Sequence, residues 1–486
     1  MKKTFHKIGV LALGIVFLST SCTKMEDFGD TNVNPGSTNK PITSALLTNV
    51  LAGIGGYASS SGPALYCQYY SETQYPEFSN YASNSATPMA NYSGGLYDLQ
   101  NIIITNTDDA TKATAALQGS NANQIQIARI LKAYIYWTLT DRWGDIPYSK
   151  ALTGDPNVDF DTQESIYKGI ITELTEAVTK FDNGAPIKGD IAYGGDISKW
   201  KKLANSMRLL MALRLSKQYP ASSDYAATQF KAALADGAGL IVTNADNFTL
   251  AFPGSSFKNP FYNMYDGRKD YGESETMTTL MSNLGGDARQ SVFGATLNGV
   301  ASTKGVPYGR SRDFLTIWTG ANPDYCYVFA PSYRTQTTSL AVVRAASILL
   351  ARAEAADKGW TSESTASLYA SGITASFEQW GIAAPTAGYL ANANVALGAA
   401  GTNLKQIATQ QYIAYFGDGT QGWSNWRRTG YPALLPAPDA TNSPKVIPRR
   451  YMYGTTDYSL NSAGVAAAVA RISGGDKMDS RVWWDK

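Results

Sequence analysis

Apolar residues recur every three to four positions through much of the chain, which is the spacing of one buried face of an α-helix. The clearest stretches carry their apolar residues at Ile127, Ile130, Leu131, Tyr134 and Trp137; at Ile166, Ile170, Leu174, Val178 and Phe181; and at Trp200, Leu203, Met207, Leu210 and Met211. Further helices are predicted over Leu340–Ala356, Glu363–Trp380 and Asn403–Phe416. The pattern therefore predicts an all-α fold.

The predicted helices have similar lengths and alternate small and large residues, as do helices that pair in hairpins. Seven alanines in 340–356 would let a neighbouring helix approach closely. No strict repeat of about 34 residues can be read. We therefore expect divergent tetratricopeptide-like helical hairpins that form a scaffold.

Two long segments lack this periodicity, about Tyr57–Tyr92 and Ala251–Pro331, and are rich in Gly, Ser, Asn and Tyr. Structureless segments of such length inside a domain are usually functional or disordered. Their aromatic content argues against disorder, so we predict long irregular loops that bind a ligand.

The chain opens with a basic stretch, 1–7, an uncharged apolar run, 8–18, and small polar residues, 19–21, before Cys22. This order is typical of a secretory signal. The run of 11 residues is shorter than the roughly 20 that a membrane-crossing helix needs.

Two cleavage products remain open. Ser19 and Ser21 satisfy the small-x-small rule for a soluble product, whereas Ser21-Cys22 reads as a lipobox whose cysteine is acylated. Residues to Pro41 are rich in Asn, Gly, Thr and Pro, as in a tether. The predicted organisation is a signal peptide, 1–21, a lipid-anchored tether, 22–42, and a folded domain, 43–486.

Composition excludes several kinds of site. The only histidine, His6, lies in the leader, so the mature chain cannot use Ser-His or Cys-His catalysis or His-ligated metal. Without Lys2, Lys3 and Lys7 the chain has 38 basic and 39 acidic residues, which argues against the clustered basic face of a nucleic-acid-binding protein. We expect no nucleic-acid partner, no cofactor and no metal cluster, although calcium bound by loop oxygens stays open.

Two cysteines remain if Cys22 is lipidated. Cys67 and Cys326 then form one possible pair. Whether they bond depends on a distance that the sequence does not give.

Several motifs occur in the order found in one family. They are Asp141-Arg142-Trp143-Gly144-Asp145-Ile146-Pro147-Tyr148, Asn205-Ser206-Met207-Arg208-Leu209, Gly305-Val306-Pro307-Tyr308-Gly309, Arg352-Ala353-Glu354-Ala355-Ala356, Gly422-Trp423-Ser424-Asn425-Trp426-Arg427-Arg428-Thr429-Gly430-Tyr431-Pro432 and Arg481-Val482-Trp483-Trp484-Asp485-Lys486. Over the whole mature chain, the sequence resembles the SusD/RagB family of nutrient-binding outer-membrane lipoproteins.

The resemblance implies an α-helical fold with tetratricopeptide-type repeats and a loop-rich ligand face. It also implies lipidation at Cys22, a place on the extracellular side of the outer membrane, and docking on a SusC-like TonB-dependent transporter. Most motif residues read as scaffold: we expect Trp423 and Trp426 to pack, and Arg427 and Arg428 to brace buried carboxylates through bidentate hydrogen bonds.

Aromatic residues concentrate in three loop patches, the first with eight aromatics among the 32 residues of Tyr66–Tyr97. Rings stack on the C–H faces of sugars and also pack on peptides. The ligand-binding candidates are Tyr75, Phe78, Tyr81, Tyr92, Tyr265, Arg268, Trp318, Tyr325 and Tyr327. A glycan is slightly favoured over a peptide, and the competing interpretation is that these rings only pin the loops to the helical body.

A catalytic reading requires a pair of carboxylates, such as Glu273 with Glu275 or Asp108 with Asp109. We interpret these as solvated loop charges, because neighbours in sequence need not face one another. Ser198 fits a Ser-x-x-Lys pattern but is predicted to be a helix N-cap. We expect a binding protein and not an enzyme, with a carboxylate-pair hydrolase or a purely structural transporter subunit as alternatives.

Overall fold

The computed structural model describes residues 41–82, 86–155 and 157–486. The predicted signal peptide, Cys22 and nearly all of the tether lie outside these residues. Regular structure among them begins with α2 (Thr43–Ala58). None of the described helices combines the length and the apolar character that crossing a bilayer demands.

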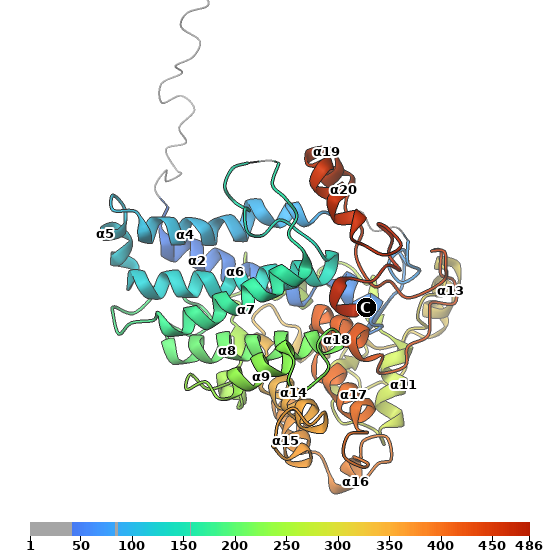
Figure 1. Ribbon diagram of the computed structural model, residues 1–486. Coiled ribbons are helices and arrows are strands. Elements are labelled where there is room, and N and C mark those ends of the chain that lie inside the picture. The colour runs from blue at the N-terminus through green and yellow to red at the C-terminus, as the bar shows by residue number, and fades with distance from the viewer. Residues whose placement is uncertain (1–40, 83–85, 156) are drawn as a thin grey trace, which may run out of the picture. The chain divides into compact units, whose positions relative to one another are not determined.

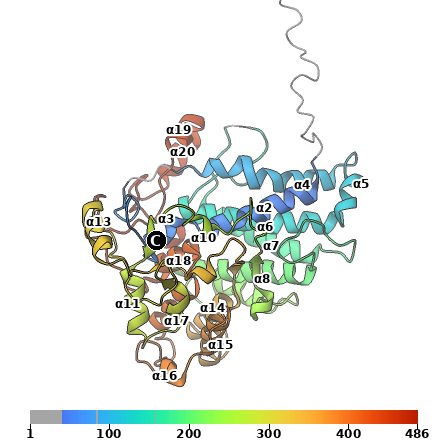
Figure 2. The same ribbon diagram turned by 180° about the vertical axis from the view of Figure 1, so that it is seen from behind.

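The first half of the folded unit is a stack of helices that follow one another in the chain and pack side by side (Figures 1 and 2). After α2 come α4 (Tyr97–Thr107), α6 (Asn121–Trp143), α7 (Gln163–Thr179), α8 (Ile197–Arg214) and α9 (Tyr225–Leu234). Polar side chains fix where they begin: Thr162 caps α7, and Asp196, not Ser198, caps α8. The N-cap prediction for Ser198 is therefore wrong by two positions.

A second group of helices continues the stack, with α14 (Ala345–Asp357) packing against α8. Helix α14 pairs with α15 (Thr365–Glu378), and α17 (Leu404–Ala414) pairs with α18 (Gly419–Thr429). The predicted all-α architecture of paired helices is confirmed. The helix expected over 340–356 is confirmed from Ala345 onward but wrong at its start, where strand β6 (Leu340–Val343) pairs with β2 (Phe248–Leu250).

The two segments predicted to be irregular contain short elements. The first holds α3 (Ser61–Tyr66), β1 (Tyr70–Glu72), η2 (Pro88–Asn91) and the start of η3 (Tyr92–Leu96); the second holds α10 (Pro260–Asn263), β3 (Tyr271–Glu273), α11 (Glu275–Asn283), α12 (Gln290–Phe293), β4 (Gly294–Ala295), α13 (Arg312–Ala321) and β5 (Tyr327–Val328). The strands form antiparallel pairs, β1 with β3 and β4 with β5. These ladders tie the loops to the helical body.

Small elements complete the described chain. They are α5 (Lys112–Ala115), η4 (Ala116–Gln118), η5 (Leu215–Lys217), η6 (Asn244–Asp246), η7 (Pro331–Tyr333), α16 (Ala387–Leu390), α19 (Thr455–Leu460), α20 (Ser462–Ala470) and η8 (Trp483–Asp485).

Early and late segments meet in one core. Helix α3 packs on α18 so closely that a Cβ at Gly419 would lie 2.4 Å from the backbone nitrogen of Ala64. Nearby, the Tyr412 hydroxyl donates to the Cys67 carbonyl at 2.6 Å. Cys67 and Cys326 are both buried and free, so they form no disulfide.

The motif residues are scaffold, as predicted. Buried Asp141 accepts hydrogen bonds from Tyr167, Ser424 and Trp484. Arg428 makes a bidentate pair with Glu354, at 2.5 and 2.6 Å. The bracing prediction is wrong for Arg427, which forms no ion pair with a described residue; its guanidinium lies 3.7 Å from the Trp423 ring centroid instead.

Candidate functional site

Three of the predicted ligand residues pack into the body. Tyr81 and Tyr92 are buried; the backbone N–H of Ala437 donates to the Tyr81 hydroxyl at 3.0 Å, and Tyr92 donates to the Pro147 carbonyl. Phe78 is half-buried, with its ring centroid 5.9 Å from that of Tyr66. Tyr81 and Tyr92 therefore present no open ring face to a ligand.

Four other candidates meet in one array of rings, the aromatic cluster of Trp318, Tyr325, Tyr327 and Tyr265. Ring centroids lie 6.1 Å apart for Trp318 and Tyr325, 4.6 Å for the stacked pair Tyr325 and Tyr327, and 5.5 Å for Tyr327 and Tyr265. The Tyr325 hydroxyl donates to that of Tyr327 at 2.8 Å. Residues from helix α13, strand β5 and the loop after α10 thus form one surface.

Backbone contacts hold this cluster in place. The Val328 N–H on β5 donates to the Tyr265 hydroxyl at 2.8 Å, and that hydroxyl donates to the Tyr271 carbonyl on β3 at 3.1 Å. Tyr325 and Tyr327 are buried, whereas Trp318 and Tyr265 are partly buried and keep some contact with solvent. A ligand would therefore meet Trp318 and Tyr265 on a preorganised support.

A pocket of about 470 Å³ adjoins the cluster and has Tyr265 in its wall. Its other lining residues are Tyr262, Asp266, Leu297, Pro331, Arg334, Thr335 and Gln336. The Arg334 guanidinium lies 4.3 Å from the Tyr265 ring centroid, and its Nε donates to the Phe329 carbonyl at 2.9 Å. Burial lowers the pKa of Arg334 from its usual range.

Arg334 forms no ion pair with any residue that the structure describes, and its Nη atoms make no hydrogen bond to one. These N–H groups can therefore donate to ligand hydroxyls from beside an aromatic face. Sequence reasoning missed Arg334. The only available signal was its position next to Tyr333, another aromatic residue of a predicted loop.

The remaining two candidates are exposed. Tyr75 is 45% exposed, and the guanidinium of Arg312, the first residue of α13, lies 5.1 Å from its ring centroid. Since Trp318 lies on the same helix, α13 joins Tyr75 to the aromatic cluster. Arg268 forms an exposed ion pair with Asp270 at 2.5 Å. Figures 1 and 2 place α13 at the edge of the molecule away from α5.

The side chain of Glu273, on strand β3 beside β5, carries a buried carboxyl group. The Glu273 N–H donates to the Cys326 carbonyl at 2.9 Å, and Gln290 donates to Glu273 Oε2 at 2.6 Å. Burial raises the pKa of Glu273 to about 8. The interpretation of Glu273 as a solvated charge is therefore wrong. Glu275 is exposed at the start of α11, so the structure shows no facing pair of carboxylates at these two positions.

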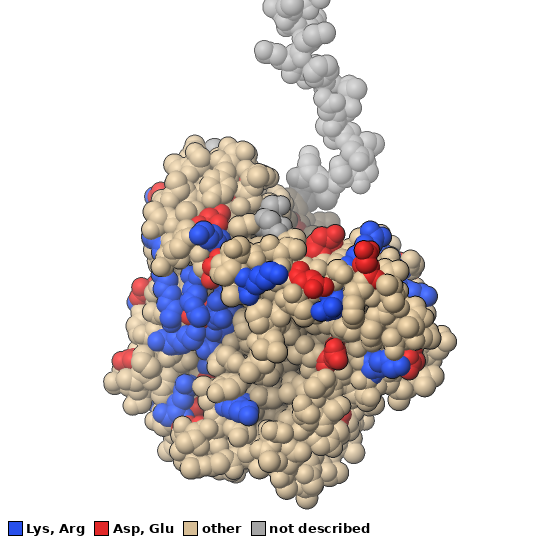
Figure 3. Space-filling view, turned by 90° about the vertical axis from the view of Figure 1, so that its right-hand side faces the viewer, with Lys and Arg blue, Asp and Glu red and all other residues tan. Residues whose placement is uncertain are grey.

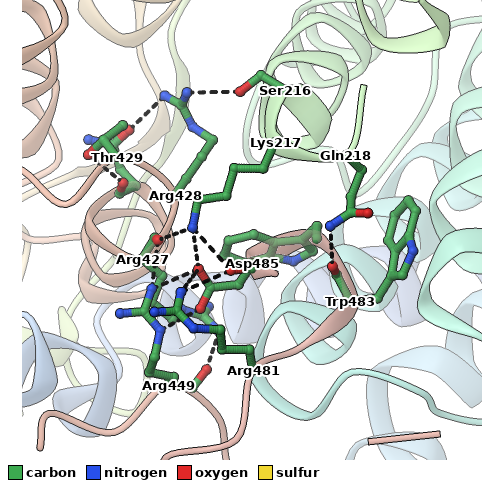
Figure 4. Close-up of polar contacts among 12 residues, drawn as sticks. Ser216, Lys217, Gln218, Arg427, Arg428, Thr429, Arg449, Arg481, Trp483 and Asp485 are labelled. Atoms are coloured by element: carbon green, nitrogen blue, oxygen red, sulfur yellow. Dashed lines mark hydrogen bonds and ion pairs between the residues drawn. The ribbon is translucent and has the colours of Figure 1, made fainter. Parts of the chain in front are cut away.

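The charge distribution also differs from the prediction. A dense patch of Lys and Arg covers part of one side of the molecule (Figure 3). Lys217 of η5 joins Arg449 and Arg481 of the C-terminal region, and all three pair with buried Asp485 (Figure 4). The even overall balance of charge therefore hides a clustered basic face. Among the described residues no group of three or more Cys, Asp or Glu is arranged to hold a metal ion.

Known structures share this fold. A solved chitin-binding protein is 30% identical, covering 91% of this chain and 99% of its own, with a TM-score of 0.73. A chitin-binding SusD homolog from Flavobacterium johnsoniae is 25% identical over 91% of this chain and 98% of its own, with a TM-score of 0.76. A SusD homolog from Bacteroides uniformis ATCC 8492, at 23% identity over 92% and 100%, has the same fold with a TM-score of 0.75.

Comparison with curated proteins gives no match. A family model described as SusD-like, starch-binding and associating with the outer membrane matches residues 35–454, which is most of the chain. The chain therefore belongs to the SusD-like family.

Proposed function

We propose that this protein binds a glycan on the outer surface of the outer membrane and passes it to a SusC-like TonB-dependent transporter. The continuous ring array of Trp318, Tyr325, Tyr327 and Tyr265 beside the pocket of about 470 Å³ carries the proposal. Aromatic rings bind the apolar faces of sugars, and Arg334 can donate to their hydroxyls.

Two further observations support a glycan. Two similar solved structures are named as chitin-binding, and the matching family is described as starch-binding. Asp266 is the one acidic residue among those that line the pocket, so the pocket walls offer no second carboxylate for glycoside hydrolysis. Binding without turnover is therefore the function that this geometry supports best.

The location and the partner belong to the same proposal. Lipidation of Cys22 would hold the protein at the membrane, and 23–42 would act as the tether. An intact-mass measurement of the mature N-terminus tests this, since an unmodified residue 22 would contradict it. Co-purification with a barrel transporter tests the partner.

Calorimetric titration with chitohexaose, and with a peptide panel as the alternative, tests the ligand. We expect saturable binding of the sugar and no cleavage products. The affinity should be about fivefold weaker in Trp318→Ala, because a stacked ring contributes on the order of 1 kcal/mol. Ile317→Ala is the matched control: Ile317 is 75% exposed on the same helix and carries no ring.

Three results would contradict the proposal. Unchanged affinity in both Trp318→Ala and Tyr265→Ala would remove the site. Binding of peptides but not sugars would replace the ligand class, and product formation by the isolated protein would replace binding with catalysis.

A further inference from the structure

The C-terminal segment gathers more positive than negative charge. Asp485 is fully buried, and its carboxylate accepts from Lys217 at 2.8 Å, Arg449 at 2.6 Å and Arg481 at 3.2 Å (Figure 4). Arg427 is buried in the same cluster and forms no ion pair with a described residue. Three cations therefore share the Asp485 carboxylate, an excess of two charges. Arg427 is not counted, because the Ser424 hydroxyl links it to a second buried carboxylate, Asp141.

A small pocket of about 160 Å³ adjoins this cluster and shares Arg481 with it. Arg450 and Arg471 also line the pocket, but each already pairs with an aspartate, at positions 476 and 145. Glu164, the one glutamate among the residues that line the pocket, pairs with Lys168 at 2.6 Å. Lys486 lines the pocket as well. The lining cations without an aspartate of their own are therefore Lys486 and Arg481, which shares Asp485 with Lys217 and Arg449.

Aromatic rings lie next to these cations. Trp483 lines the pocket and is half-exposed, with its ring centroid 6.1 Å from Tyr219, which lies 5.7 Å from Tyr225. Lys168 Nζ lies 5.6 Å from the Tyr219 ring and 5.4 Å from that of Tyr225. Gln218 donates to the Trp483 carbonyl at 2.8 Å and so holds this ring near η5 (Figure 4).

We propose that this surface is a second glycan subsite, distinct from the aromatic cluster, that binds an acidic sugar bearing a carboxylate or a sulfate ester. The inference rests on the proposed glycan-binding function. Guanidinium groups form charge-assisted hydrogen bonds with such oxyanions, and the rings of Trp483 and Tyr219 offer a face to the sugar.

The arrangement leaves Arg481 free to turn toward a ligand. Its side chain is 48% exposed, and Asp485 keeps Lys217 and Arg449 as partners if Arg481 moves away. The aromatic rings and the pocket favour a sugar as the ligand. A flat anionic membrane would instead bind to an exposed basic surface that has no pocket.

Titration with tetragalacturonate and with its full methyl ester tests whether binding requires negative charge, because the two ligands have the same sugar rings and differ in charge. We expect the acid to bind at least tenfold more tightly in 50 mM NaCl, and the difference to shrink in 300 mM NaCl through screening. Dextran sulfate against dextran forms the second arm and shows whether sulfate or carboxylate is preferred.

Arg481→Ala and the longer Arg481→Gln should each weaken binding of the acid about tenfold and leave binding of the ester unchanged. Lys150→Ala is the matched control, because its side chain is 68% exposed and pairs with Asp159 away from this cluster.

Equal affinity for the acidic and neutral members of both pairs would overturn the inference, as would full affinity in both Arg481 variants. Binding to phosphatidylglycerol vesicles that depends on Arg481, without binding of either acidic sugar, would also overturn it and assign the surface to the membrane. In each case chitohexaose binding that depends on Trp318 would leave the proposed function standing, whereas loss of all sugar binding would refute both.

Discussion

Replacing Glu273 by Gln should stabilise the protein, and by an amount that grows with pH. The carboxyl group is fully buried, and burial raises its pKa to about 8 from about 4.5 for an exposed glutamate. Because the folded state holds this proton more tightly than the unfolded chain does, ionisation favours unfolding as pH rises from 4.5 to 8. Below pH 4.5 both states are protonated and the effect vanishes.

The pKa values set the magnitude. At about 1.36 kcal/mol for each pH unit between them, Glu273 destabilises the fold by an amount on the order of 3 kcal/mol at pH 7, and by more at pH 8.5. Glutamine has the same shape, stays neutral and keeps an oxygen for the hydrogen bond from Gln290 at 2.6 Å. Glu273→Gln should therefore be more stable by this order at pH 7 and 8.5, and little changed at pH 4.5.

Urea denaturation of the wild-type protein and of Glu273→Gln at pH 4.5, 7 and 8.5 measures the difference in their free energies of unfolding. Burial also raises the pKa of Glu72 to about 7 and that of Asp418 to about 6, but both groups are present in each protein and cancel. Glu275→Gln is the control, since Glu275 is exposed and should change little. A gain that is the same at all three pH values would refute the reasoning.

Two further predictions concern packing and charge in the helical body. Gly419→Ala should lower the free energy of unfolding by about 1–3 kcal/mol, because its Cβ would lie 2.4 Å from the Ala64 nitrogen. Gly53→Ala, at a helix position with open space around it, should raise the free energy of unfolding by about 0.5–1 kcal/mol. Equal effects of the two substitutions in denaturant titrations would contradict this prediction. Arg428→Ala should cost about 3–5 kcal/mol by leaving Glu354 buried without its bidentate partner. Lys150→Ala breaks an exposed pair and should leave the free energy of unfolding nearly unchanged. Similar losses in the two variants would show that the buried pair contributes little.

The helices could be predicted from the sequence because their signal is local. The three- and four-residue spacing of apolar residues in the sequence correctly predicted the positions of α6, α7 and α8. The signal failed at β6, where Leu340–Val343 pairs with β2, a partner nearly a hundred positions earlier. A short apolar run reads alike as helix or buried strand until its partner is known.

The candidate site could be predicted only in part, for the same reason. Tyr81 and Tyr325 both looked like loop aromatics, yet Tyr81 is fixed by Ala437, far along the chain, while Tyr325 stacks in the aromatic cluster. The basic cluster brings Lys217 together with Arg449 and Arg481, so a count of charges could not reveal it.

The contacts between early and late segments have a consequence for how the chain folds. Tyr70 pairs with Glu273, and Ala64 meets Gly419, so essential contacts close very long loops and the contact order is high. Such topologies fold slowly, because the entropy of closure is lost before the contacts are gained. An open repeat array tolerates removal of a terminal unit, whereas deleting α2 and α3 here would strip α18 of its neighbour, so we expect truncated chains to collapse without reaching a unique fold.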